Sequence, residues 1–235
     1  MIYLFDVDGT LTPSRQKIDK EFAVWFSKFC EQESVYLVTG SDKPKTLEQI
    51  GPVVYNRCKG VYQCSGNEYW MKETLIRSNN WKLPDIARQF LLQCLAEEKF
   101  DIRTGNHIEE RPGMVNYSVV GRNADNQQRQ AFVEYDKSTN SRINTANAFN
   151  TMFPDLQATV GGETGLDIAP RGFDKGQIVK DFNKSCKIKF FGDAMWEGGN
   201  DYSLKIALQN TNFAFAECIE VKDWTQTWDM LNDIN

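Results

Sequence analysis

The first strand and the turn after it constrain this chain more than any other segment. Met1–Asp8 is a short apolar run that ends in two carboxylates, Asp6 and Asp8, and is followed by Gly9. Such a run is typical of a strand buried in a parallel sheet. Carboxylates at i and i+2 lie on one side of a strand, and a glycine permits a sharp turn beyond them. Because ligands of open α/β sheets bind beyond the carboxyl ends of the strands, we expect a site at Asp6 and Asp8.

The same Asp-x-Asp-Gly pattern also occurs in turns and in calcium-binding loops. An EF-hand loop needs a glutamate at its twelfth position, and the twelfth residue counted from Asp6 is Lys17. The calcium interpretation therefore fails, and the buried strand before Asp6 favours a catalytic role.

Helices and strands are predicted to alternate at both ends of the chain. At the N-terminal end we expect a helix over about Ser14–Gln32, a strand over Val35–Thr39 and a helix opened by Asp42-Lys43-Pro44. Such alternation predicts a doubly wound parallel sheet. The pattern resumes at Asp174 with a helix to Asn183, the strand Ile188–Phe191, a helix after Gly199, the strand Phe213–Phe215 and a helix near Asp223–Leu231.

The middle of the chain has a different pattern. Strands over Ile102–Ile108 and Val115–Val120, around an Arg111-Pro112-Gly113 turn, are typical of antiparallel pairing. The other elements expected there are a helix over Leu83–Glu98, a long polar helical region over Asn126–Met152, and strands over Leu156–Val160 and Leu166–Ala169. The predicted fold is therefore α/β, with a Rossmann-like core of parallel strands (1–79 and 172–235) and an inserted α+β cap domain with an antiparallel sheet (80–171).

Composition narrows the range of partners. The chain has 235 residues and a formal charge of −5, which argues against a nucleic-acid or anionic-membrane surface. No window holds the roughly 18 apolar residues of a membrane span. The six cysteines are scattered without a metal-ligand spacing, so we expect reduced thiols in a cytoplasmic protein.

Three further segments agree with a phosphate site at the same sheet edge. Thr39 ends the second expected strand, and its hydroxyl could donate to a phosphate. Lys175 begins a helix whose N-terminus would also favour an anion. Asp193 and Asp201 lie in a glycine-rich loop after a strand, where a cation site and a simple turn are both open interpretations.

The order of these motifs resembles the haloacid dehalogenase-type phosphotransferase superfamily and, more narrowly, the eukaryotic-type phosphomannomutases. The matching stretches are LFDVDGTLTPSRQKI (4–18), LVTGSD (37–42), IEERPGMVNYSVVGR (108–122), GGETGLDIAPRGFDKGQ (161–177) and FFGDAMWEGGND (190–201).

The resemblance implies a role for each matching residue. Asp6 would be the nucleophile that carries an aspartyl-phosphate, and Asp8 the acid/base. Mg²⁺ would be held by Asp6, the Asp8 carbonyl and Asp193, supported by Asp201. The residues that would bind phosphate or sugar are Arg15, Thr39, Arg111, Arg122, Asp167 and Lys175.

The chain departs from the family pattern at three points. Arg103 is displaced by one residue from the usual arginine, and such a slip in a strand turns a side chain to the opposite face. Gly165 stands where a serine is usual, and Ala194-Met195 replace more polar residues. These changes affect sugar and phosphate recognition and leave the Asp6/Asp8 chemistry intact.

The leading functional hypothesis is a phosphohexomutase that interconverts mannose 6-phosphate and mannose 1-phosphate, a step toward GDP-mannose. The resemblance also implies a hexose bisphosphate activator and a homodimer formed through the cap. The alternative is a Mg²⁺-dependent sugar-phosphate phosphatase with the same aspartates and water as the acceptor. A catalytically inactive sugar-phosphate-binding protein is disfavoured because Asp6 and Asp8 are both present. Mannose and glucose phosphates both stay open as substrates.

Overall fold

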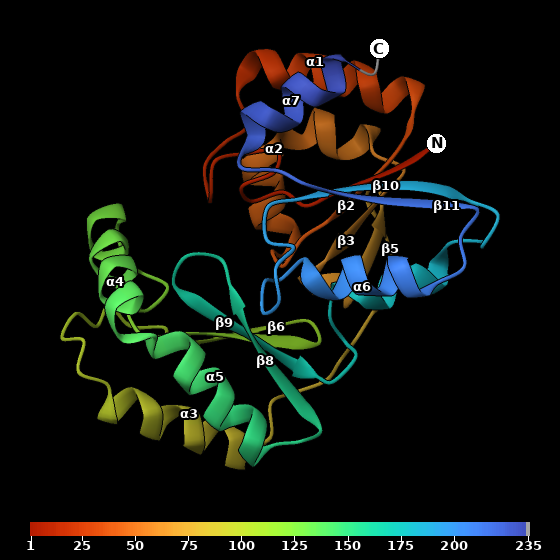
Figure 1. Ribbon diagram of the computed structural model, residues 1–235. Helices are drawn as coiled ribbons and strands as arrows, with labels where there is room; N and C mark the ends of the chain where they lie inside the picture. Colours follow the sequence, from red (N-terminus) through yellow and green to blue (C-terminus); the bar gives the residue numbers. More distant parts are fainter. Residues whose placement is uncertain (234–235) are drawn as a thin grey trace. The chain divides into compact units, whose positions relative to one another are not determined.

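A seven-stranded sheet organises the first part of the computed structural model, which describes residues 1–233. This part, called unit 1, consists of Met1–Asn79 and Phe173–Asn235. Its strand order is β11-β10-β1-β2-β3-β4-β5, in which β11 to β3 are parallel and β4 and β5 add an antiparallel hairpin (Figure 1). The strands are β1 (Ile2–Phe5), β2 (Ser34–Val38), β3 (Gly60–Gln63), β4 (Glu68–Met71), β5 (Thr74–Ser78), β10 (Lys187–Gly192) and β11 (Phe215–Glu220). The predicted α/β class is confirmed.

Helices cover both faces of this sheet. One face packs on α1 (Lys20–Gln32), α2 (Lys43–Arg57) and α7 (Trp224–Asn232), and the other on α6 (Tyr202–Asn210) and the 3₁₀ segment η2 (Lys175–Asp181). A further 3₁₀ turn, η1 (Cys64–Gly66), follows β3. In β1, Tyr3 and Phe5 face the first layer and Leu4 faces the second, so the strand is apolar throughout because both of its faces are buried.

Several elements of unit 1 differ from their predicted bounds. The first helix begins at Lys20 rather than near Ser14, because Asp19 caps it by accepting from the backbone N–H groups of Glu21 and Phe22. The segment expected as a helix from Asp174 to Asn183 is the shorter 3₁₀ turn η2. The last strand begins at Phe215, where the prediction ended it.

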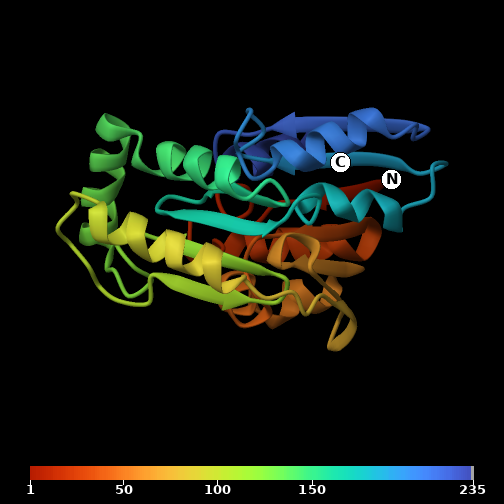
Figure 2. The same ribbon diagram turned by 90° about the horizontal axis from the view of Figure 1, so that it is seen from below.

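The second part, unit 2, comprises Asn80–Gly172. Its antiparallel sheet has the order β6-β7-β9-β8, and Figures 1 and 2 show helices packed along one side of it. The strands are β6 (Ile108–Arg111), β7 (Met114–Ser118), β8 (Leu156–Gly161) and β9 (Gly165–Pro170). The helices are α3 (Asp85–Glu97), α4 (Asn126–Thr139) and α5 (Ser141–Met152). The predicted α+β character of this segment is confirmed, whereas its role as a cap remains a prediction.

Two predictions within unit 2 are wrong in detail. The strand expected over Ile102–Ile108 begins only at Ile108 and runs to Arg111. The long helical region is two helices, because Asn140 adopts a left-handed conformation with φ of 56°, which asparagine tolerates better than most residues.

Asn67 joins the two places where the chain leaves and re-enters unit 1. This buried side chain donates from Nδ2 to the carbonyl oxygens of Cys64 (2.8 Å) and Phe173 (3.3 Å). Its Oδ1 accepts from Nδ2 of Asn79 at 3.0 Å. Residues 79 and 173, which flank unit 2 in sequence, are therefore held by one side chain.

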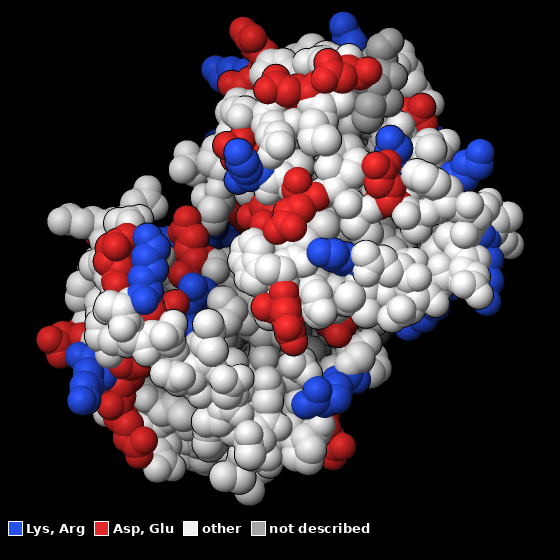
Figure 3. Space-filling view, in the orientation of Figure 1, with Lys and Arg blue, Asp and Glu red and all other residues white. Residues whose placement is uncertain are grey.

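Charge is spread over the surface. Figure 3 shows acidic and basic side chains interspersed over the visible faces of both units. Among the described residues, no helix is both long enough and apolar enough to cross a bilayer.

Candidate active site

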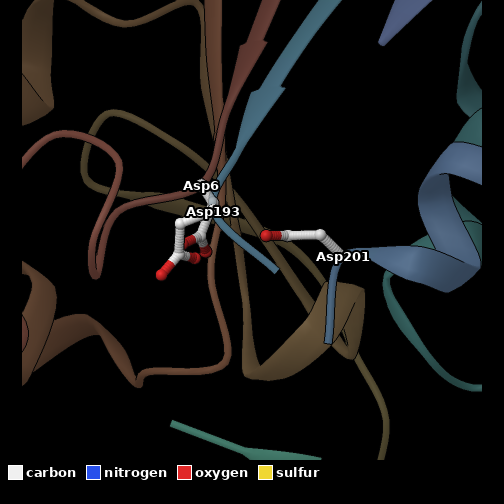
Figure 4. A group of neighbouring side chains, drawn as sticks. All are labelled: Asp6, Asp193 and Asp201. Atoms are coloured by element: carbon white, nitrogen blue, oxygen red, sulfur yellow. The ribbon is translucent and has the colours of Figure 1, made fainter. Parts of the chain in front are cut away.

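Three aspartates converge at the carboxyl ends of adjacent strands in unit 1. Asp6 follows β1, and Asp193 follows β10, which pairs with β1 in parallel register. Asp201 reaches the same place from the start of α6 (Figure 4). One carboxylate oxygen from each lies within 4.8 Å of the others. We call Asp6, Asp193 and Asp201 the carboxylate cluster.

Gly9 is required beside this cluster for reasons of both space and backbone conformation. Its φ is +82°, a region that side chains disfavour, and a Cβ atom placed there would lie 2.1 Å from Oδ2 of Asp193. The glycine after the two strand-end carboxylates therefore lets the Asp193 side chain approach β1.

Lys175 is the buried counter-charge of the cluster. Its Nζ donates to Oδ1 of Asp6 and, at 2.8 Å, to Oδ1 of Asp201, and its side chain is only 1% exposed. Burial alone would lower the pKa of Lys175, but Asp201 and Asp6 together raise it above its ordinary value. The lysine is therefore held charged.

One lysine does not neutralise three aspartates. Burial raises the pKa of Asp6 well above its usual range, against the opposing effect of Lys175, and Asp201 and Asp193 raise it further. Burial, and then Asp201, raise the pKa of Asp193 to about 7. Oδ2 of Asp6 is buried without a hydrogen-bond partner among the described residues. This excess negative charge, with oxygen ligands only, fits a hard divalent cation such as Mg²⁺.

Asp8 is oriented by two hydrogen-bond donors. Its Oδ1 accepts from the backbone N–H of Arg15 at 2.6 Å and from Nε2 of Gln49 at 2.8 Å. Arg15 has a φ of 57°, and this left-handed turn presents its N–H to Asp8. Gln49, on α2, is buried. Asp8 is thus oriented by a residue distant in sequence.

Thr39 lies just beyond the end of β2, next to β1 in the sheet. Its side chain is buried, and Oγ1 accepts from the backbone N–H of Ser41 at 3.0 Å. This hydroxyl keeps its own proton available as a donor.

The predicted sugar-phosphate residues of unit 2 lie on the sheet face opposite its helices. Arg111 and Arg122 are both nearly buried and both contact Glu109. Nε of Arg111 lies 2.9 Å and Nε of Arg122 lies 3.1 Å from the same oxygen, Oε2. Asp167, on β9, accepts at Oδ1 from Nδ2 of Asn116 at 2.7 Å. Arg111 and Arg122 are therefore brought together, and Asp167 lies two strands away from Arg111, on β9.

Arg103, whose displacement the sequence shows, is used elsewhere in unit 2. Its Nη2 donates to the carbonyl oxygens of Glu98 (3.0 Å) and Leu95 (3.4 Å) at the end of α3. Arg103 therefore caps a helix C-terminus and does not join Arg111 and Arg122 at Glu109.

Sequence reasoning missed Gln49, Glu109 and Asn116. Each of them contacts a predicted site residue. Apart from Arg111, which is two residues from Glu109, these partners are distant in the sequence. The only signal available was a polar residue inside a strand or helix that is otherwise partly apolar.

Comparison with known proteins was consistent with the motifs. The family model of eukaryotic phosphomannomutase matches residues 22–222. A phosphomannomutase of Saccharomyces cerevisiae is 36% identical over 214 residues, which cover 86% of this chain and 84% of the relative. A phosphomannomutase of Spinacia oleracea is 35% identical over 216 residues, which cover 87% of this chain and 86% of the relative.

Solved structures establish the fold. The C-terminal domain of a Candida albicans trehalose-6-phosphate phosphatase aligns with a TM-score of 0.67 at 13% identity, covering 99% of this chain and 91% of that one. A haloacid dehalogenase-like hydrolase of Bacteroides thetaiotaomicron aligns with a TM-score of 0.59 at 15% identity, covering 100% and 99%. The Rossmann-like core of haloacid dehalogenase type is confirmed.

Proposed function

The chain belongs to the eukaryotic phosphomannomutase family, and on this premise we propose that it interconverts mannose 6-phosphate and mannose 1-phosphate through an aspartyl-phosphate on Asp6. The observation that carries this proposal is the state of the Asp6 carboxylate. One oxygen is held by Lys175, while the other, Oδ2, is buried and has no partner among the described residues. A carboxylate oriented in this way presents one lone-pair-bearing oxygen as a nucleophile.

The transfer is a balanced displacement at phosphorus. Oδ2 of Asp6 forms a bond to one phosphorus atom of a hexose bisphosphate, the bond from that phosphorus to the sugar oxygen breaks, and that oxygen takes a proton from Asp8, so that a hexose monophosphate is released. In the second half-reaction Asp8 removes the proton from the free hydroxyl of a hexose monophosphate, and this oxygen attacks the phosphorus, which restores the Asp6 carboxylate and regenerates a bisphosphate. Lys175 and Thr39 would donate to the oxygens of the transferring group.

The cofactor we propose is Mg²⁺, held by the side chains of Asp6 and Asp193 and the backbone carbonyl of Asp8, with Asp201 in support. When bound, it supplies positive charge that offsets the charge of the carboxylates and of the phosphoryl group. The raised pKa values of Asp6 and Asp193 support this assignment, because Lys175 does not offset the burial and the neighbouring carboxylates that raise them.

Unit 2 would supply recognition of the sugar phosphate, with the residues 80–171 acting as a cap over a core of 1–79 and 172–235. We assign the phosphate remote from the metal to Arg111 and Arg122, supported by Arg15, and a sugar hydroxyl to Asp167. Guanidinium groups suit this task because their paired donors match phosphate oxygens. A hexose bisphosphate would serve as the activator, since it can phosphorylate Asp6.

Two further proposals concern the setting of the enzyme. A cytoplasmic location is supported by six free thiols, which are usual in reducing compartments. A homodimer through unit 2 follows from the resemblance to the family. Sedimentation of the protein at several concentrations tests the dimer, and a single monomeric species throughout would exclude it.

A coupled assay tests the reaction itself. Mannose 1-phosphate is supplied with Mg²⁺, with and without a hexose 1,6-bisphosphate, while mannose 6-phosphate and free phosphate are measured in parallel. A mutase converts the substrate in a bisphosphate-dependent manner and releases little phosphate. Stoichiometric release of free phosphate would instead identify a sugar-phosphate phosphatase.

A further inference from the structure

A row of four side chains crosses the helix-free face of the unit 2 sheet. Strand register pairs Glu109 of β6 with Asn116 of β7, Asn116 with Asp167 of β9, and Asp167 with Thr159 of β8. We call these four residues the polar row. Their sequence neighbours, such as Val115 and Leu166, face the helices and belong to the apolar core. The row is therefore a continuous polar strip on an otherwise ordinary half-buried sheet.

Asn116 occupies a central place in this strip and is itself only 5% exposed. Nδ2 of Asn116 donates to Oδ1 of Asp167 at 2.7 Å. Oδ1 of Asn116 is buried without a hydrogen-bond partner among the described residues. Buried polar atoms normally have a hydrogen-bond partner, and none of the described residues supplies one here, so a bound ligand is a candidate for it.

The orientation of the Asn116 amide follows from its neighbour. A carboxylate accepts hydrogen bonds and does not donate them, so the NH₂ group of Asn116 must face Asp167. Its oxygen is then turned away from Asp167 and acts only as an acceptor. The missing partner must therefore be a donor, such as a hydroxyl group.

Two glycines keep this part of the row clear. A Cβ atom at position 165 would lie 2.7 Å from Nδ2 and 3.0 Å from Oδ1 of Asn116. A Cβ atom at position 161 would lie 2.4 Å from Oδ2 of Asp167. The two glycines therefore leave the space beside the Asn116 amide and the Asp167 carboxylate free of other side chains. Each of these two groups keeps an oxygen that can accept a hydrogen bond.

The rest of the row fixes the direction of the ligand. Glu109, next to Asn116, contacts the two cationic side chains Arg111 and Arg122. The strip therefore runs from a cationic end at β6 to hydrogen-bond acceptors at β7 and β9. A molecule with an anionic group at one end and neighbouring hydroxyl groups beside it has complementary chemistry.

We propose that Asn116 is a specificity residue, whose Oδ1 accepts a hydrogen bond from one hexose hydroxyl while Asp167 accepts from a neighbouring one. The proposal rests on the proposed function for the identity of the sugar phosphate. It adds a second acceptor to the sugar site and a requirement for two adjacent hydroxyls.

A panel of monodeoxy analogues of mannose 1-phosphate tests this assignment. For the wild-type enzyme, two neighbouring deoxy positions should each lower kcat/KM by about ten- to a hundred-fold, the usual effect of leaving a buried group unpaired. Asn116→Ala should lower kcat/KM for mannose 1-phosphate by a similar factor. In this variant, removal of the hydroxyl that Asn116 binds should not lower kcat/KM any further. Removal of the neighbouring hydroxyl, which Asp167 binds, should still lower it.

Thr159→Val is the matched control. Thr159 lies in the same row, but its hydroxyl is directed to the backbone carbonyl of Asp167 at 3.3 Å. Across the deoxy analogues, Thr159→Val should therefore show the same relative kcat/KM values as the wild type. If Asn116→Ala lowers kcat/KM equally for every analogue, Asn116 has only a structural role and the proposal is overturned.

The outcomes separate this proposal from the proposed function. If wild-type protein shows no turnover of mannose 1-phosphate, the proposed function fails, and calorimetric binding of the same panel then tests Asn116. If Asn116→Ala does not fold, the measurements of the deoxy analogues on the wild-type protein alone test the proposal. Loss of binding or activity at two adjacent positions supports the proposal, and loss at one position or none overturns it.

Discussion

Lys175 illustrates how a single buried side chain orients Asp6, the residue proposed as the nucleophile. The lysine holds Oδ1 of Asp6, which leaves Oδ2 as the oxygen without a partner. Breaking such a buried pair by removing one member typically costs about 3–5 kcal/mol of stability. The arrangement is therefore costly to disturb.

Asp6→Asn should abolish turnover and prevent the formation of a phosphoenzyme, because an amide oxygen is a far weaker nucleophile. Labelled hexose bisphosphate followed by peptide mapping should mark Asp6 in the wild type and no residue in the variant. Asp42→Asn, at the N-cap of α2, keeps a capping residue and should be labelled as the wild type is. Label on a residue other than Asp6 would contradict the mechanism.

Asp193 should make Mg²⁺ binding depend on pH. The pKa of Asp193 is raised to about 7 in the folded protein, above its ordinary value of 3.8. Its contribution to the free energy of unfolding is therefore fully present below about 3.8 and is lost as the pH rises through about 7. Because Mg²⁺ needs the ionised carboxylate, the rise in Tm caused by Mg²⁺ should grow between pH 6 and pH 8. An equal rise at both pH values would contradict this prediction.

Gln49 should affect phosphoryl transfer by orienting Asp8. Gln49→Leu removes a hydrogen bond to a carboxylate, worth roughly 1.5–3 kcal/mol, so phosphorylation of Asp6 by a sugar bisphosphate should slow about ten- to a hundred-fold. Acetyl phosphate has a leaving group that needs no proton, and its rate should change little. Stopped-flow phosphoenzyme formation with both donors measures the difference. Gln63 is another buried glutamine and does not contact Asp8, so Gln63→Leu should affect both phosphoryl donors equally. If Gln49→Leu also slows phosphorylation equally with the sugar bisphosphate and with acetyl phosphate, Gln49 does not act through Asp8.

Secondary structure was predictable wherever the hydrophobic period was clear. The buried strands β1, β2 and β10 and the helices α1, α2 and α7 follow this pattern. The β4–β5 hairpin was missed because its turn places Lys72 at a φ of 55°, without the glycine or asparagine that usually marks such a turn. The break between α4 and α5 was missed because Asn140 lies inside a continuous polar helical pattern.

The residues of the candidate site likewise include some that the sequence predicts and others that it does not. Asp6, Asp193 and Lys175 were predictable because they lie next to strand ends or at the start of the segment that was expected as a helix and is the 3₁₀ turn η2. Gln49 and Asn116 were not, since their partners lie 41 and 51 residues away in the chain. Hydrogen bonds between such distant side chains depend on which helices and strands lie side by side, and the hydrophobic periodicity of a single element does not determine that arrangement.

The β6–β7 hairpin should discriminate a mutase from a phosphatase through Arg111. Losing a charged contact to phosphate should cost roughly 1.5–3 kcal/mol, or about ten- to a hundred-fold in kcat/KM. Arg111→Ala should therefore reduce mutase turnover while sparing slow hydrolysis of a small aryl phosphate, which has no distal phosphate. Arg142→Ala removes an arginine paired with Asp136 in the same unit and should leave the ratio of the two activities unchanged. A ratio unaffected by Arg111→Ala would favour the phosphatase alternative.

Within the described residues 1–233, the chain passes from unit 1 to unit 2 after Asn79 and returns after Gly172. We expect both connections to act as hinges that close unit 2 over the sugar and exclude water. X-ray scattering should show a smaller radius of gyration with Mg²⁺ and a hexose bisphosphate than without them, whereas inorganic phosphate should have little effect. Identical profiles in all conditions would contradict the closing motion.

The hydrogen bonds of Asn67 have a consequence for engineering. Because one side chain ties residues 79 and 173 together inside unit 1, a short linker in place of 80–172 would join two ends that already meet. On the proposed division of roles, the segment has the properties of an exchangeable cassette: specificity for a different phosphate ester could be grafted between these two points, with the aspartates proposed as catalytic left unchanged in the chimera.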